Sequence, residues 1–233
     1  MKILGISGSP RKEGTSGTAK LVRAVLEASG CEYEYVSLGG KRIAGCISCL
    51  GCVEDNVCKV QDDFTPLREK IVDADAYVIG APNYYTGLNA LTHAFLERWF
   101  QFRHRECGLL WGKLGVAVGV GGTGGQPPAD DIEKFLAYSF IETVSKVAAQ
   151  GAASCYICGF GETCKIGIPH FLFGEGVKIT PETTPDVAKQ PEVMAAAAAA
   201  GRLLGERLRQ REERMAVAQR MMRAMKEKFK ASA

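Results

Sequence analysis

A run of four cysteines constrains this chain more than any other feature of its sequence. Cys46, Cys49, Cys52 and Cys58 fall within thirteen residues, with the spacing C-x2-C-x2-C-x5-C. Such a short loop can wrap four sulfurs around one small inorganic group, whereas pairing them as disulfides would strain it. Zinc sites usually divide two C-x2-C pairs across a long spacer, but a repeated x2 spacing with a fourth cysteine nearby suits a [4Fe–4S] cluster. We therefore predict a cluster here, with zinc and plain thiols as the alternatives.

The other cysteines and the composition indicate the cellular setting. The chain has 233 residues, nine of them cysteine, and a formal net charge of +3. This length allows one large or two small domains. No signal peptide is evident, and no apolar run is long enough to span a bilayer. The sequence therefore predicts a protein of the reducing cytoplasm with no membrane span, in which thiols stay free to bind metal.

Short apolar runs alternate with amphipathic stretches along the first two thirds of the chain. This alternation predicts an α/β protein in which five parallel strands form one sheet with helices on both faces. The expected doubly wound strand order is 2-1-3-4-5. The predicted strands are residues 2–7, 31–38, 76–81, 114–120 and 152–157. The first predicted helix follows the loop after the first strand and ends near residue 29, and the others span 64–73, 88–102 and 130–149.

The loop after the first predicted strand has the character of a phosphate-binding loop. It runs from Gly8 to Thr18, is rich in glycine and hydroxyl side chains, and carries Arg11. A strand, such a loop and then a helix N-terminus present free N–H groups to an anion. The loop matches neither the Walker A nor the GxGxxG pattern, and an ordinary turn with a Ser or Thr helix cap is the alternative.

Two further loops follow the third and fourth predicted strands at the same edge of the sheet. Residues 82–87 place an asparagine and two tyrosines there, whereas residues 121–126 have almost no side chains. A glycine-rich loop costs conformational entropy unless something must approach its backbone closely. Together the loops suit a flat heterocycle at the switch point of the sheet, and a surface turn with packed aromatics is the alternative.

The motifs together resemble a known family. Residues 5–12 (GISGSPRK), 80–85 (GAPNYY) and 121–126 (GGTGGQ) are similar to the NADPH-dependent FMN reductase superfamily. With the cysteine run added, residues 1–160 resemble the iron–sulfur flavoproteins of that superfamily. The resemblance implies a flavodoxin-like fold with one FMN and one [4Fe–4S] cluster, held by Cys46, Cys49, Cys52 and Cys58. It also implies a homodimer or homotetramer in which the cluster of one subunit lies near the FMN of another.

The resemblance assigns the cofactor-binding residues by position. The FMN phosphate would contact Ser9, Arg11, Ser16, Gly17 and Thr18, although the family usually has Gly-Asn-Thr where this chain has residues 15–18. The isoalloxazine ring would lie against Pro82, Asn83, Tyr84, Tyr85, Gly87, Gly121, Gly122 and Thr123. We predict no catalytic side chain, because the cofactors carry the chemistry.

A protein with both cofactors can convert two-electron into one-electron transfer, because a flavin takes two electrons and a cluster carries one. We therefore predict an FMN-dependent oxidoreductase, with a ferredoxin-like protein or NAD(P)H as electron donor, a small molecule as acceptor, and no nucleic-acid partner. One alternative is a cluster-free NAD(P)H-dependent FMN or quinone reductase. A second is a non-catalytic protein, either a flavodoxin-type electron carrier or a zinc-stabilised scaffold.

A second group of cysteines lies near the end of the last predicted strand. Cys155, Cys158 and Cys164 are spaced C-x2-C-x5-C. They could bind a second metal if Cys107, His170 or a partner chain supplied a fourth ligand, or form a redox disulfide. Buried thiols are the alternative.

The C-terminal third has a different character. We divide the chain into an FMN-binding domain (1–165), which includes the cysteine loop 43–60, and a segment (166–233) that is first irregular and then helical. Residues 202–230 contain ten Arg and Lys against four Glu. This basic helix is predicted to pack on another subunit or to bind an acidic partner such as a ferredoxin.

Overall fold

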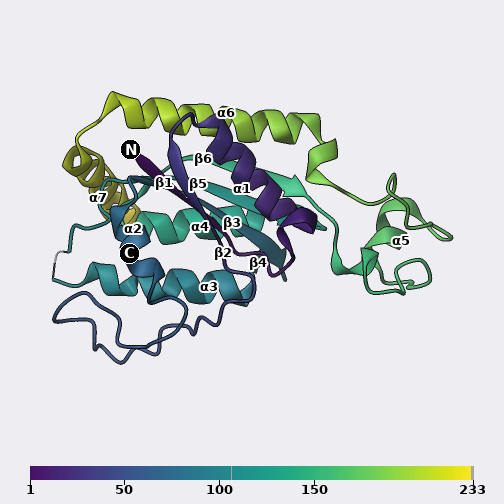
Figure 1. The fold of residues 1–233 in the computed structure, drawn as a ribbon, viewed down its shortest axis with the longest axis horizontal. Helices are drawn as coiled ribbons and strands as arrows, with labels where there is room; N and C mark the ends of the chain where they lie inside the picture. Colours follow the sequence, from purple (N-terminus) through teal and green to yellow (C-terminus); the bar gives the residue numbers. More distant parts are fainter. Residues whose placement is uncertain (106, 232–233) are drawn as a thin grey trace.

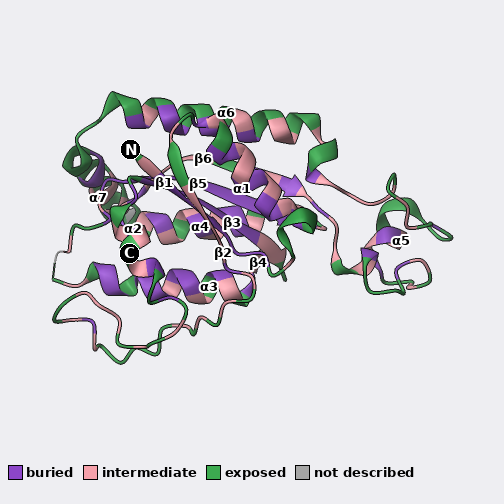
Figure 2. Ribbon diagram, viewed as in Figure 1, coloured by how far each residue is buried: buried purple, intermediate pink, exposed green. Residues whose placement is uncertain are grey.

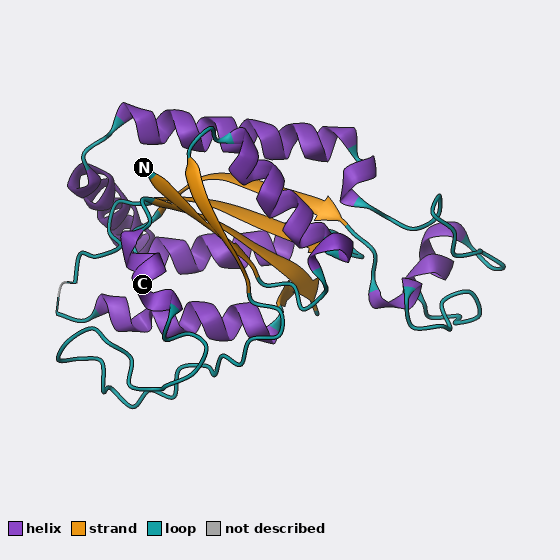
Figure 3. Cartoon of the chain, viewed as in Figure 1, coloured by secondary structure: helices purple, strands orange, loops and turns teal. Residues whose placement is uncertain are grey.

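A parallel sheet forms the centre of the protein in the computed structural model, which describes residues 1–105 and 107–231 (Figures 1 and 3). The strand order is β2-β1-β3-β5-β6, and all neighbouring pairs along it are parallel. This order confirms the predicted flavodoxin-like sheet. The strands are β1 (Lys2–Ser7), β2 (Glu32–Ser37), β3 (Ala76–Tyr84), β5 (Leu114–Gly121) and β6 (Glu142–Gln150), and the short β4 (Gly87–Leu88) pairs antiparallel with β3.

Helices cover both faces of this sheet (Figure 1). One face is covered by α1 (Gly17–Ala28) and α6 (Pro191–Gln210), and the other by α2 (Leu67–Asp73), α3 (Ala90–Glu97) and α4 (Gln126–Tyr138). Of two more helices, α5 (Ile168–Phe173) lies away from these layers, whereas α7 (Arg214–Ala231) packs near β6 and buries Val217 and Ala218. The 3-10 helices are η1 (Glu13–Thr15), η2 (Arg98–Arg103), η3 (Ser154–Tyr156) and η4 (Val187–Lys189).

The central strands are buried (Figure 2), and their residues alternate between the two halves of the core. In β1, Leu4 and Ile6 pack with α3 and α4, whereas Ile3 faces α1. Gly5 also faces α1, and a Cβ there would lie 2.3 Å from the Cδ1 atom of Leu26. The glycine therefore lets α1 pack closely on β1, which holds the N-terminus of α1 at the carboxyl edge of the sheet.

The last strand and the helix before it differ from the prediction. The sequence predicted a helix over 130–149 and a strand over 152–157, but α4 spans Gln126–Tyr138 and β6 spans Glu142–Gln150. Helix α4 starts early because Pro127 and Pro128 occupy its first turn, where proline is favoured. It ends early because Phe140 has a left-handed φ of 52°, a conformation that bulky residues rarely adopt. Residues 152–157 belong to the loop and 3-10 turn that follow β6.

The basic C-terminal segment forms two helices rather than one. Helix α6 ends at Gln210, and the next residue, Arg211, has a left-handed φ of 51°. Ala197, Ala200 and Leu204 of α6 are buried against α1 and the sheet, so this helix is part of the core. Part of the basic charge is neutralised inside the chain, because Arg207 and Arg220 pair with Glu142 and Glu212. Among the described helices, none has the length and apolar character needed to cross a membrane.

Lys113 gives the fold a testable pH dependence. Its buried ammonium donates to the carbonyl oxygens of Ile71 (3.3 Å) and Val72 (2.6 Å). Burial, with a smaller effect of Arg214, lowers its pKa from 10.5 to about 8. Between those values the unfolded chain binds a proton that the folded chain does not, so the free energy of unfolding rises with pH. We expect the free energy of unfolding of the wild type to rise by about 3 kcal/mol from pH 8 to 10.5, relative to that of Lys113→Met. Urea unfolding of both proteins at several pH values measures this difference. Parallel pH profiles of the two proteins would contradict this.

Candidate functional site

A cavity of about 670 Å³ opens at the carboxyl edge of the sheet. The loops after β1 and β5 line it, as the sequence predicted, and residues 151–154 and 184–187 complete it. Pro82, Asn83 and Tyr84 also line it, but they form the end of β3 and not the predicted loop. Of the predicted cofactor-binding residues, the structure brings together Ser9, Arg11, Ser16, Gly17, Thr18, Pro82, Asn83, Tyr84, Gly121, Gly122 and Thr123 around this cavity, and leaves Tyr85 and Gly87 outside its lining.

One end of the cavity suits a phosphate group. The N-terminus of α1 faces it, and Ser16 caps this helix by accepting a hydrogen bond from the N–H of Ala19 (3.1 Å). Arg11 reaches across to donate to the carbonyl oxygen of Ala152 (2.8 Å), which joins the loops after β1 and β6. A guanidinium beside a helix N-terminus favours an anion. The predicted helix cap and the predicted phosphate loop are thus parts of one arrangement.

The cap gives a prediction that separates structure from binding. Ser16→Ala removes the hydroxyl oxygen that accepts from Ala19, and loss of a helix N-cap typically costs about 1 kcal/mol. We expect that loss in urea unfolding of the FMN-free protein, and a further loss of stabilisation by FMN if the hydroxyl also binds phosphate. Thr15→Ala is the control for unfolding of the FMN-free protein, because the Thr15 hydroxyl is exposed and donates to the carbonyl of Lys12. Equal stability of Ser16→Ala and wild type would contradict the capping role.

The other end of the cavity suits a flat ring. Asn83 donates from its side-chain nitrogen to the carbonyl of Gly124 (2.8 Å), while its Oδ1 atom is buried without a hydrogen-bond partner. That oxygen is available to accept from an N–H group of a ligand. A Cβ at Gly122 would lie 2.6 Å from the Cβ of Ala153, so the glycine keeps the two loops in close contact. The lining therefore fits a flavin with a phosphate tail.

Tyr85 and Gly87 do not line the cavity, because the chain turns back at this position. Tyr85 and Thr86 both have left-handed φ angles, 50° and 63°, which form the tight turn between β3 and β4. The Tyr85 side chain is fully exposed. The lining residues that the sequence analysis missed, Ala152, Ala153, Ser154 and Asp186 among them, lie in the segment assigned to a strand and in the irregular segment.

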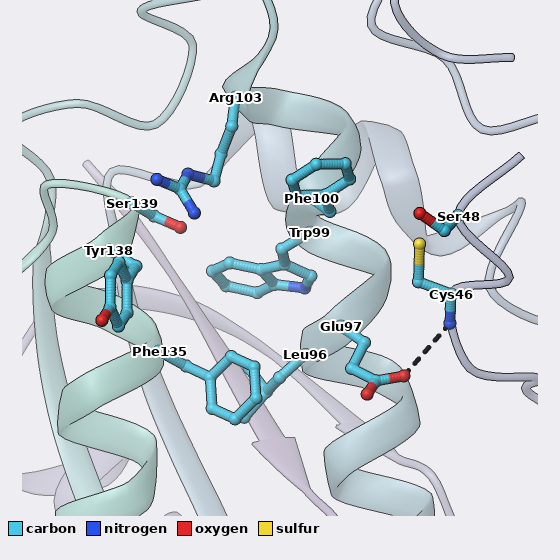
Figure 4. Close-up of a pocket in the computed structure, with 10 residues that line it drawn as sticks. All are labelled: Cys46, Ser48, Leu96, Glu97, Trp99, Phe100, Arg103, Phe135, Tyr138 and Ser139. Atoms are coloured by element: carbon cyan, nitrogen blue, oxygen red, sulfur yellow. Dashed lines mark hydrogen bonds between the residues drawn. The ribbon is translucent and has the colours of Figure 1, made fainter. Parts of the chain in front are cut away.

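The cysteine run lies in a loop without regular structure that is attached to α3 and η2 at both ends. The N–H of Cys46 donates to Glu97 Oε2 (3.1 Å), and the N–H of Cys58 donates to Gln101 Oε1 (3.0 Å). These acceptors lie one helical turn apart, so one helix face positions both ends of the run. The dashed line in Figure 4 marks the first of these contacts.

A buried arginine fastens the base of the loop. The Arg98 side chain donates to the carbonyls of Ala44 (3.1 Å) and Val60 (2.9 Å) and to Asp62 Oδ2 (2.6 Å). Only 1% of the Arg98 side chain is exposed. Burial alone would raise the pKa of Asp62, but its bonds from the N–H of Ala44 and from Arg98 outweigh this effect and lower it. The carboxylate therefore stays charged and, with Arg98, connects the two ends of the loop near Ala44 and Asp62.

The four thiols have different surroundings. Cys46 and Cys49 are exposed, Cys58 is half-buried, and Cys52 is buried with its sulfur 3.2 Å from His104 Nε2. Burial first, and then the charges of the other three cysteines, raise the pKa of Cys52. Within residues 1–105 and 107–231, no three Cys, His, Asp or Glu side chains converge in metal-binding geometry. The donor set fits a cluster by its chemistry and anchoring, and the exposed thiols must turn inward to bind one.

A second, smaller cavity of about 300 Å³ adjoins Cys46 (Figure 4). It lies between η2 and α4, and its walls are largely aromatic, with Trp99, Phe100, Phe135 and Tyr138 around it. Phe100 and Tyr138 are exposed large hydrophobic side chains. An apolar hollow beside an expected cluster ligand marks this face as a candidate contact surface.

The sheet, the cavity at its carboxyl edge and the cysteine loop define a flavodoxin-like α/β protein suited to a flavin mononucleotide. Residues 1–153 match the family described as NADPH-dependent FMN reductase. An iron–sulfur flavoprotein of Methanocaldococcus jannaschii is 38% identical over 135 residues, which are 54% of this chain and 66% of that protein. One of Archaeoglobus fulgidus is 32% identical over 148 residues, 63% of this chain and 75% of that protein. The chain belongs to the NADPH-dependent FMN reductase family of oxidoreductases and, within it, to the iron–sulfur flavoproteins.

Solved structures support the same fold. A flavone reductase superposes with a TM-score of 0.58 at 18% identity, covering 92% of this chain and 65% of that one. The Trp repressor binding protein from Bacillus subtilis superposes with a TM-score of 0.53 at 19% identity, covering 85% of this chain and 99% of that one. At these identities the likeness concerns the fold alone.

Proposed function

We propose that this chain holds FMN in the 670 Å³ cavity and a [4Fe–4S] cluster on Cys46, Cys49, Cys52 and Cys58, and passes electrons between them. The observation that carries this proposal is the presence, in one chain, of a phosphate-and-ring cavity and an anchored loop with four thiols. The name of the relatives, iron–sulfur flavoprotein, supports the same pair of cofactors. When bound, FMN supplies two-electron chemistry and the cluster one-electron transfer.

The residues of the chain would bind and orient these groups. Arg11 and the N-terminus of α1 would hold the phosphate, and Asn83 Oδ1 would accept a hydrogen bond from the ring. Arg98 and Asp62 would keep the cluster loop in place. The buried position of Cys52 would limit access of water to that side of the cluster.

The electron path would cross a subunit interface. None of the four cysteines lines the 670 Å³ cavity, so a second copy in a homodimer or homotetramer would bring its FMN to this chain's cluster. The aromatic hollow beside Cys46 supports that face as the contact. We place the protein in the cytoplasm, with a ferredoxin-like protein or NAD(P)H as donor and a small molecule as acceptor.

Iron, sulfide and FMN contents of anaerobically purified protein test the cofactors. We expect about four irons and one FMN per chain, the composition of one [4Fe–4S] flavoprotein subunit. Cys49→Ser is expected to lose the iron and keep the FMN, while Cys31→Ser, outside both cysteine groups, is expected to keep both. FMN without iron in the anaerobic wild type would leave a cluster-free FMN or quinone reductase instead.

A mixed dimer tests the path between subunits. One chain carries Cys49→Ser, which removes the cluster, and the other carries Gly121→Ala, which weakens FMN binding. A different affinity tag on each chain allows the mixed dimer to be purified. At an FMN concentration that fills only the intact cavity, one cross-subunit pair of cofactors remains, so we expect about half the wild-type rate of cluster reduction. No cluster reduction in the mixed dimer would contradict transfer between subunits and indicate a path within one chain.

Helix α7 is the surface proposed for an acidic ferredoxin. Arg223 and Lys226 are exposed on it, and rim charges chiefly change the association rate. We expect Arg223→Glu with Lys226→Glu to slow ferredoxin-dependent reduction about tenfold at low salt, with little effect at high salt. Glu227→Lys on the same helix is the control and should not slow it. Equal rates in wild type and the double variant would remove this surface from the proposal.

A further inference from the structure

An extended segment leaves the body of the protein after β6, and its residues Ser154, Ile157 and Ile168 line part of the 670 Å³ cavity. This segment, residues 154–179, is called the arm here. It projects from one end of the sheet and contains η3 and α5 (Figure 1). Most of its surface is exposed or half-buried (Figure 2). It lies outside the residues matched to the reductase family, which end at 153.

Apolar burial contributes little to the stability of the arm. Its large apolar side chains are mostly exposed: Ile157 (71%), Phe160 (72%), Ile166 (81%) and Phe171 (72%). Short segments that cannot build a core are usually stabilised by a disulfide or a metal ion. All three cysteines of the arm are free in the structure, and thiols of a reducing compartment stay reduced.

The arm contains a compact set of soft donors. Cys155, Cys158, Cys164 and His170 follow one another with spacers of two, five and five residues. Three thiolates and one imidazole are a donor set of structural zinc sites.

The turn at Cys155 and Cys158 directs a backbone N–H toward a cysteine sulfur. The N–H of Phe160 donates to the sulfur of Cys158 (3.4 Å). Gly159, between them, has a left-handed φ of 84°, which glycine adopts without strain and which turns this N–H back toward the sulfur. A backbone N–H on a cysteine sulfur stabilises the thiolate form that binds metal.

Cys164 is held against the same turn. Its N–H donates to the carbonyl of Phe160 (2.9 Å). The intervening Gly161 packs so closely on the turn that a Cβ there would lie 2.1 Å from the carbonyl oxygen of Cys155. The backbones of all three cysteines are therefore connected through residues 160 and 161.

His170 is oriented toward the same unit by a hydrogen bond. Its Nε2 atom lies 3.1 Å from the carbonyl oxygen of Glu162, two residues before Cys164. A carbonyl can only accept, so Nε2 carries the proton and Nδ1 has its lone pair free for a metal. The Glu162 carboxylate accepts from the N–H of Ile179 and from Lys178 (both 2.9 Å), which ties in the returning end of the arm.

We propose that Cys155, Cys158, Cys164 and His170 bind one zinc ion that holds the arm together. In the structure the Cys158 thiol donates to the carbonyl of Cys155 (3.4 Å), and the arm's side chains, like those of the loop 43–60, do not converge in metal-binding geometry within the described residues. Binding replaces the three S–H bonds by S–Zn bonds, adds one N–Zn bond and releases three protons. Cys158 is exposed and can turn inward.

Metal analysis of the full chain, purified anaerobically with its iron, tests the site. We expect about one zinc per chain in the wild type, and its loss in Cys158→Ser, in Cys164→Ser and in His170→Ala, with iron content unchanged. His170→Cys should keep the zinc, since four thiolates also bind it. Cys31→Ser is the matched control and should keep both metals. Because iron and zinc are counted in the same sample, failure of this proposal is distinct from failure of the cluster proposal.

Proteolysis gives a second measurement. Trypsin can cut the arm at Lys165 and Lys178, and we expect cleavage there to be about tenfold faster in Cys158→Ser than in the wild type, because local opening controls access. Zinc absent from the wild type, zinc unaffected by the ligand variants, or about eight irons per chain would each overturn the zinc site, the last in favour of a second cluster.

Discussion

Arg98→Leu is expected to lower the free energy of unfolding by about 3–5 kcal/mol, the usual cost of removing one partner of a buried ion pair. The remaining Asp62 carboxylate is only 13% exposed and would lose its charged partner. The carbonyls of Ala44 and Val60 would lose their donor as well. Since these groups fasten the base of the cysteine loop, we also expect iron content to fall well below that of the wild type.

Urea unfolding and iron analysis of the same preparations measure both effects. Arg103→Leu is the matched control, because Arg103 lies on the same 3-10 helix but is exposed. The double change Arg98→Leu with Asp62→Leu removes both charges and should recover much of the stability, yet not the iron, because the loop carbonyls remain without a donor. A stability loss below about 1 kcal/mol in Arg98→Leu, together with normal iron content, would show that Arg98 does not fasten the loop.

The burial of Arg98 illustrates what the sequence could not show. Residues 88–102 were predicted as one helix, and an arginine in a helix is ordinarily exposed. Its partners lie 36 to 54 residues away in a loop without regular structure, so no local pattern connects them. The cysteine spacing, by contrast, is a local pattern, and it identified the loop directly.

The same distinction applies to the sheet. The strands β1, β3 and β5 are continuous apolar runs bounded by glycine, proline or aspartate, and the predicted positions match closely. Strand β6 was misplaced because the turn before it is made by Phe140 in a left-handed conformation, where glycine or asparagine would have signalled a break. That error placed residues 152–157 in a strand and thereby hid Ala152 and Ala153, which line the cavity.

The cavity loops that are rich in glycine or hydroxyl residues could be predicted from the sequence. Glycine and hydroxyl residues after β1 and glycines after β5 are enough, by their composition alone, to indicate a ligand. Tyr84 and Tyr85 are equivalent in the sequence but not in space, because Tyr84 ends β3 and Tyr85 begins a left-handed turn. Arg11 contacts a carbonyl 141 residues further along the chain, which only the assembled sheet brings within reach.

Gly121→Ala is expected to weaken FMN binding on the order of 100-fold, because overpacking a close contact typically costs 1–3 kcal/mol. A Cβ at position 121 would lie 2.4 Å from the Cβ of Asn83 and 2.5 Å from the carbonyl oxygen of Gly124. The loop after β5 would have to move away from Asn83. That movement would break the bond from Asn83 to Gly124 and displace the buried Oδ1 atom proposed to accept from the ring.

Titration of the FMN-free protein with FMN, followed by flavin fluorescence, measures the change. Gly108→Ala is the control, because a Cβ there would meet only Trp111, at 3.7 Å, and the site is remote from the cavity. Iron content should be the same in both variants, since the cysteine loop contacts neither glycine in the interactions described. An unchanged FMN affinity in Gly121→Ala would mean that the flavin does not depend on the contact between these two loops, and the ring would then have to bind elsewhere than against Asn83.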